Sequence, residues 1–270
     1  MLETYAAYGF KDEKVKGYLG AYYAFGKSHP IRYPINRLKV WYQNDVKIPG
    51  QNLKFIQEDN FFLSFKRGVN NKMYYVKTAG IEYLKENYDG ITYTFSAQNI
   101  RYAPAGALKF DYERQDGTFI QKEVITTELG ASFRYAPNEQ FYQGATYRTP
   151  ILNKYPVFTV DYTAGVGNFL SSQYDYHRVT LKAEKTFYLS PIGWSIVVME
   201  GGRVFGNVPY PLLVAHRANQ TYAYQLESYN LMNFLEFVSD KYFAISAFHN
   251  FGGFFFNRIP LLRRPGNGAR

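Results

Sequence analysis

Apolar and polar residues alternate with a period of two through most of the chain. In PVFTVDYTAGV (156–166) every second side chain from Phe158 onward is apolar, and the residues between them are threonine, aspartate or glycine. The same alternation recurs in ITYTFSAQ (91–98), ITTELGASFRY (125–135) and HRVTLKAEKTFY (177–188). Because successive side chains of a strand point to opposite faces, each stretch predicts a β-strand with one apolar and one polar face.

The pattern predicts about 13 strands, joined in part by tight turns at YDG (88–90), RQDG (114–117), SPIG (190–193) and SDK (239–241). The connections 136–156 and 206–229 are long. If successive connections alternate strictly between the two rims of the sheet, 136–156 lies on the same rim as the short turn at 190–193. Either a strand is misplaced there or this connection folds on itself. The expected strands are 3–10, 15–26, 36–43, 59–67, 73–86, 90–101, 107–112, 119–135, 157–166, 176–188, 193–205, 230–239 and 241–257.

The fold class expected from these strands is all-β, in one domain over residues 1–270. Many strands exceed the five or six residues usual in globular proteins, and their polar faces carry charges at mid-strand. Both features are typical of an antiparallel transmembrane β-barrel, in which apolar side chains face lipid and polar ones face a lumen. The alternative is a soluble antiparallel protein, binding lipid or glycan, whose polar face meets water.

Composition narrows the function. Aromatic residues make up 19% of the chain, and several lie near strand ends, as in the aromatic girdles of membrane barrels. The absence of cysteine excludes disulfides, zinc-thiolate sites and cysteine nucleophiles. The net charge of +9 is scattered along the strands, so we expect anionic lipid or lipopolysaccharide as a partner rather than nucleic acid. The start of the chain does not read as a signal peptide.

Five segments together resemble a known family: 44–68, 136–165, 174–182, GNVPYPLLVAHRANQTYAY (206–224) and 229–264. They are similar to the membrane part of an uncharacterised Bacteroidota outer-membrane family. Its members usually carry an N-terminal carboxypeptidase-regulatory-like domain, followed by a barrel similar to the BamA/TamA assembly superfamily. The resemblance covers roughly residues 30–264.

The resemblance implies a barrel of about 16 strands in the bacterial outer membrane. Against that pattern the regulatory domain and the closing strands are missing, so we expect a chain truncated at both ends. The resemblance also implies that connection 206–229 folds into or over the lumen, where Arg217 contacts the inner wall with His216 beside it. The sequence leaves open whether the protein also binds partner proteins in the periplasm or the outer membrane. The residues expected in this connection are Pro209, Tyr210, Pro211, His216, Arg217 and Asn219.

No hydrolase, nucleotide-binding or metal-binding motif is present, and we expect a non-enzymatic protein without cofactor or metal that serves envelope biogenesis, protein assembly or transport. An outer-membrane enzyme is a further alternative, because Ser171, Ser172, Asp175 and His177 lie close in sequence. Charges on the polar faces are expected to neutralise one another inside the barrel. These lumenal charges are Glu128, Arg134, Asp161, Arg178, Lys182 and Glu184.

Overall fold

The fold is all-β. The computed structural model describes residues 1–10, 12–26, 29–51, 65–68, 70–114, 117–144, 148–225 and 227–259. Ten strands form one antiparallel sheet in which each strand pairs with the next along the chain, apart from three short two-stranded pairs that lie outside this sheet. These strands are β1 (Leu2–Gly9), β2 (Lys14–Ala24), β3 (Asn36–Lys47), β4 (Lys72–Glu86), β5 (Ile91–Gly106), β8 (Val124–Tyr135), β11 (Val157–Gly165), β12 (Tyr176–Tyr188), β13 (Trp194–Phe205) and β16 (Lys241–Asn250).

The sheet is open. β1 and β16 are its two edges and do not pair with each other, so the described residues do not close a barrel. Among these residues no helix has the length and apolar character needed to cross a membrane.

The connections differ between the two rims. Those after β1, β3, β5, β11 and β13 lie at one rim, called here the loop rim. Those after β2, β4, β8 and β12 lie at the other, the turn rim. At the turn rim, connection 136–156 folds on itself through β9 (Phe141–Gln143) and β10 (Arg148–Pro150). This hairpin accounts for a long connection at the rim of short turns.

Several expected strands need correction. Residues 107–112 are not a sheet strand: the connection 107–123 holds the hairpin of β6 (Asp111–Arg114) and β7 (Gly117–Ile120), so the strand expected at 119–135 begins only at Val124. The strand expected at 241–257 ends at Asn250, because Gly252 and Gly253 take positive φ angles in a turn. The strand expected at 59–67 falls mostly outside the described residues.

The strand expected at 230–239 is also wrong. Only Val238–Ser239 (β15) is extended there, paired with β14 (Val214–Ala215). Glu236 N donates to Asn233 O, Asn233 N donates to the Glu236 carboxylate, and Leu235 has a positive φ. Local bonds of this kind satisfy backbone groups in place of a ladder partner, so alternation alone gives the wrong structure here.

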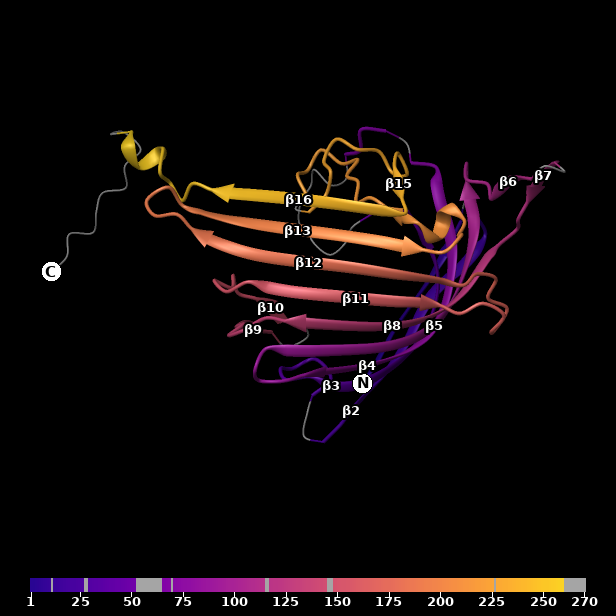
Figure 1. Cartoon of the computed structure of the whole chain (residues 1–270), viewed down its shortest axis with the longest axis horizontal. Coiled ribbons are helices and arrows are strands. Elements are labelled where there is room, and N and C mark those ends of the chain that lie inside the picture. Colours follow the sequence, from indigo (N-terminus) through magenta and orange to yellow (C-terminus); the bar gives the residue numbers. More distant parts are fainter. Residues whose placement is uncertain are drawn as a thin grey trace.

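The two faces of the sheet have opposite character. Connection 206–240 lies against part of one face, called here the inner face, with contacts to β4, β12 and β13 (Figure 1). The other, the outer face, is exposed, and large apolar side chains stand on it along all ten strands together with a few cations. Each strand places at least one large apolar side chain on it: Leu2, Leu19, Val40, Ile81, Phe95, Leu129, Val160, Leu181, Met199 and Phe243.

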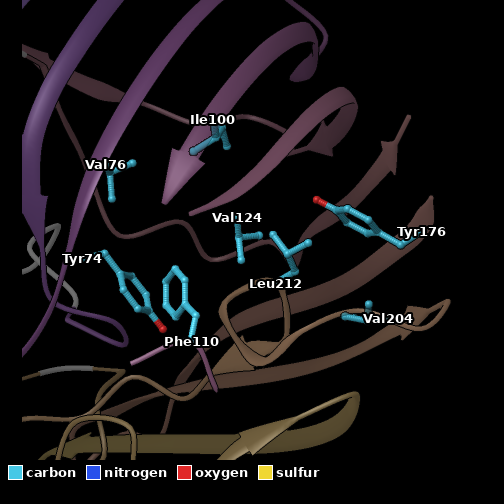
Figure 2. Packing of buried hydrophobic residues seen from close by; sticks show 8 residues of the cluster. All are labelled: Tyr74, Val76, Ile100, Phe110, Val124, Tyr176, Val204 and Leu212. Atoms are coloured by element: carbon cyan, nitrogen blue, oxygen red, sulfur yellow. The ribbon is translucent and has the colours of Figure 1, made fainter. Parts of the chain in front are cut away.

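The largest buried cluster lies on the inner face near the loop rim. It joins β4 to β13, so the sheet curls around it. Figure 2 shows Leu212, from connection 206–240, pointing toward Val124, with Tyr74 and Phe110 on one side and Tyr176 on the other. The remaining members of the cluster are Val76, Ile100 and Val204.

Candidate functional site

The candidate site is the inner face together with connection 206–240. The connection leaves β13 at Gly206 and makes a single 3₁₀ turn at Tyr210–Leu212, which Pro209 precedes and Pro211 stiffens. Proline suits this place because its fixed φ angle matches the start of a helical turn and its missing N–H would be unpaired there. The turn directs Leu212 into the cluster, where 1% of its surface is exposed.

Tyr210 holds the start of the connection against the loop rim. Its hydroxyl donates to the backbone oxygen of Lys109 at 3.1 Å, and its ring lies 5.7 Å from that of Phe110 and 6.5 Å from that of Tyr74. Burial raises the pKa of Tyr210 above that of free tyrosine, and the charge of Asp111 adds to the effect. The neutral phenol is therefore the form that fits this position.

A chain of charges follows in the second part of the connection. Arg217 Nη1 lies 3.0 Å from Glu200 Oε2 of β13 and 3.9 Å from Glu227 Oε2. Lys182 Nζ, from β12, bonds both oxygens of Glu227 at 3.0 and 2.9 Å, and the Tyr242 hydroxyl donates to Glu200 at 2.5 Å. Two carboxylates and two cations thus neutralise one another between the connection and the sheet.

His216 and Asn219 serve the connection itself. His216 Nε2 lies 2.8 Å from the Ser239 hydroxyl, and its ring meets those of Tyr229 and Tyr242 edge-on. The buried side chain of Asn219 donates to Ala223 O and Asn230 Oδ1 and accepts from Thr221 N and Oγ1, at distances of 2.7–2.8 Å. These bonds give the irregular backbone a defined shape.

The connection after β3 meets the same segment. Ala218 N donates to Gly50 O at 3.0 Å, and Arg67 donates to the backbone oxygen of Asn219 at 2.6 Å. Gly50 has a φ of 77°, and a Cβ atom there would lie 2.4 Å from the oxygen of His216. Glycine is therefore required for the two connections to lie this close.

The six expected lumenal charges all face the connection side of the sheet, but they do not form one cluster. Glu128 accepts from Gln98 Nε2 at 2.9 Å and from the hydroxyl of Tyr176, deep beside the apolar cluster. Arg178 donates to the backbone oxygen of Leu212 at 3.0 Å. Asp161 lies opposite Ser132 and Thr180 by register.

The other three charges line a cavity of about 370 Å³ between the connection and the turn rim. Arg134 forms two bonds of 2.6 Å with Glu139, while Glu184 lies 3.8 Å from Lys182. The apolar lining includes Ile151, Leu152, Ile196, Val198 and Phe248. The cavity is thus mixed in character, with its charges already paired.

The serine, aspartate and histidine side chains weighed as a hydrolase are not gathered. Ser172 Oγ accepts from Thr127 N at 3.1 Å, Asp175 accepts from Gly167 N at 2.6 Å, and His177 bonds the Tyr162 hydroxyl at 2.7 Å. Ser172, Asp175 and His177 thus each have a separate partner, so the geometry does not assemble a triad. Among the described residues no group of three or more acidic or histidine side chains could hold a metal ion.

Sequence reasoning missed Glu200, Glu227 and Tyr242. Glu200 and Tyr242 stand at inward positions of their strands, so period-two alternation could have found them. Glu227 lies in irregular backbone with a φ of 55°, and no periodic signal marks it.

A family model matches residues 1–267, which is nearly the whole chain, and its description is "Family of unknown function (DUF5686) C-terminal domain". The chain belongs to this family. No curated protein and no solved structure matches it. Assignment of a role to the DUF5686 C-terminal domain therefore rests on the chemistry of its two faces.

Proposed function

We propose that this domain is a non-enzymatic outer-membrane β-barrel, of the type similar to BamA and TamA, that serves envelope biogenesis, protein assembly or transport. The observation that supports it most is the outer face, which exposes large apolar side chains on ten consecutive strands. Exposed apolar surface of this extent marks contact with a membrane or a partner. The inner face carries every carboxylate of the ten strands beside its apolar cluster, and a lumen likewise holds polar and charged side chains.

In this proposal connection 206–240 occupies the lumen, and Arg217 anchors it to the wall through Glu200. The loop rim, with most of the long connections, faces the outside of the cell, and the turn rim faces the periplasm. The curled sheet would be completed to about 16 strands by further strands, because an open edge leaves backbone groups unpaired in hydrocarbon. Outer-membrane lipid, lipopolysaccharide and envelope proteins would be its partners.

A pair of substitutions tests the membrane assignment. Phe95 is 55% exposed on the outer face of β5, four residues from the start of the strand at Ile91, and Leu231 is 84% exposed in connection 206–240. In a bilayer, Phe95→Arg should cost about 2–4 kcal/mol and reduce the folded fraction, whereas Leu231→Arg should change little. In water, a cation at either exposed position would be tolerated within about 0.5 kcal/mol.

The measurement is heat-modifiable migration on gels after reconstitution in detergent or lipid. The proposal expects folding only with detergent or lipid, and loss of the fast-migrating form in Phe95→Arg alone. A stable monomer without detergent, in which both variants fold like the wild type, would refute it in favour of a soluble β protein that binds lipid or glycan.

A further inference from the structure

The acidic residues of the sheet lie on one face only, whereas cations stand on both faces. Register places every Asp and Glu of the ten described strands on the inner face, from Glu3 in β1 to Glu200 in β13. The outer face carries cations without a carboxylate among them. These cations are Lys77, Lys85, Arg101, Lys185, Arg203 and Lys241. The outer face therefore favours contact with anions.

These cations form two directly opposed pairs, Lys77 with Arg101 on β4 and β5 and Arg203 with Lys241 on β13 and β16, and only the second pair borders the apolar hollow described next. Arg203 of β13 pairs with Lys241 of β16 at the loop rim, and both side chains are exposed. The ion pairs of the described residues include neither one, and the Arg203 guanidinium lies 4.6 Å from the centre of the Phe205 ring. Like charges facing each other across a ladder destabilise a sheet, and an anion between them removes that repulsion.

An apolar hollow of about 400 Å³ begins in the next row of the same face. Gly201 lies at its floor, between Leu181 of β12 and Phe243 of β16 by register. A Cβ atom at Gly201 would meet its nearest neighbours at 3.6 Å, an ordinary contact. Packing alone does not demand glycine here, so the hollow is room that a side chain could fill. The other apolar residues lining it are Phe158, Val160, Ala183 and Met199.

We propose that Arg203, Lys241 and the hollow over Gly201 bind one molecule of lipopolysaccharide. A lipid A phosphate lies between the two cations, with a bidentate contact to the Arg203 guanidinium, and one acyl chain fills the hollow. The inference rests on the proposed function, because only a barrel with its loop rim outward brings this site to the leaflet that holds lipopolysaccharide. Charge complementarity, the adjacent apolar hollow and the position at the loop rim together select this occupant over a zwitterionic lipid.

The test uses the detergent-extracted protein, with purified lipid A added and retention measured by native mass spectrometry. The wild type should retain one lipid A and little phosphatidylcholine. Each cation near an anionic headgroup should contribute roughly fivefold in affinity, so Arg203→Gln with Lys241→Gln should lose about 25-fold. Gly201→Leu should lower retention by filling the hollow, without a backbone clash.

Two controls separate the site from general effects. Lys185→Gln removes an outer-face cation near the turn rim, and Ala97→Leu adds bulk to the outer face of β5. Both should retain lipid A like the wild type. All variants should show wild-type heat-modifiable migration, which establishes that they fold.

Retention of lipid A by the double variant at wild-type affinity would overturn the inference. Equal wild-type retention of phosphatidylglycerol would overturn the choice of lipopolysaccharide. If the protein folds only in detergent but retains no lipid A, this inference is wrong and the proposed function is unaffected. If the protein is monomeric and stable without detergent, both this inference and the proposed function are wrong.

Discussion

Leu212 is the residue on which the docking of connection 206–240 depends most. Its side chain is almost fully buried in the cluster that joins β4 to β13, and its backbone oxygen accepts a bond from Arg178. Truncation of a buried leucine to alanine costs about 2–5 kcal/mol, since the apolar contacts are lost and a cavity remains. A value near 3 kcal/mol raises the undocked population about 100-fold.

The Arg217–Ala218 bond reports this change, because trypsin cleaves after arginine and this segment is bonded to Gly50 and Tyr229 when docked. Cleavage of a transiently opened segment follows the open population when reclosing is fast. We therefore expect Leu212→Ala to raise the initial cleavage rate at this bond about 100-fold, as measured by mass spectrometry of the released peptides.

Leu231→Ala is the matched control, because it makes the same chemical change at an exposed site of the same connection. It should alter stability by no more than about 0.5 kcal/mol, and cleavage after Arg217 by no more than a few-fold. Equal acceleration in both variants would show that burial of Leu212 does not hold the connection, and the reasoning would fail.

Three further predictions concern polar contacts. Arg217→Ala should destabilise the docked connection by only about 1–2 kcal/mol, because Glu200 keeps its bond from Tyr242; hydrogen exchange of 206–229 should rise less than in Leu212→Ala. The raised pKa of Tyr210 contributes stability that is present below the ordinary value of 10.0 and is lost as pH rises through the raised pKa. The melting temperature of the wild type should therefore fall more steeply above about pH 10 than that of Tyr210→Phe. Parallel curves of melting temperature against pH for the two proteins would contradict this. Among the described residues, Arg148→Ala leaves the carboxylate of the buried Glu86 with a single bond, from Ile35 N. It should therefore cost about 3 kcal/mol and lower the melting temperature by roughly 6–12 °C, with partial recovery on adding Glu86→Gln.

The strands were the predictable part of this protein. Alternation in 157–166 and 176–188 located β11 and β12 to within one residue, because in a two-faced sheet side-chain character follows strand geometry directly. The all-β class follows from the same signal. The alternation also assigns the faces, so that Asp161 and Lys182 could be placed on the polar side before any contact was known.

Alternation fails where backbone groups are satisfied by local bonds. The expected strand at 230–239 is irregular because its backbone groups bond locally: Met232 N donates to Tyr229 O, Glu236 N donates to Asn233 O, and Asn233 N donates to the Glu236 carboxylate. Period-two alternation does not encode such turns, because it reports only which side chains would share a face if the segment were extended.

The sequence by itself determined which side chains share a face, because a period of two is a property of the extended chain. It also marked 206–229 as unusual through its prolines and apolar run. Only the tertiary structure decided which charges meet. Arg217 pairs with Glu200, 17 residues away, and Lys182 with Glu227, 45 residues away, because the curled sheet and the folded connection bring β12, β13 and residues 217–227 together. Pairing of this kind depends on which distant segments the folded backbone brings together, and alternation along one strand does not encode that.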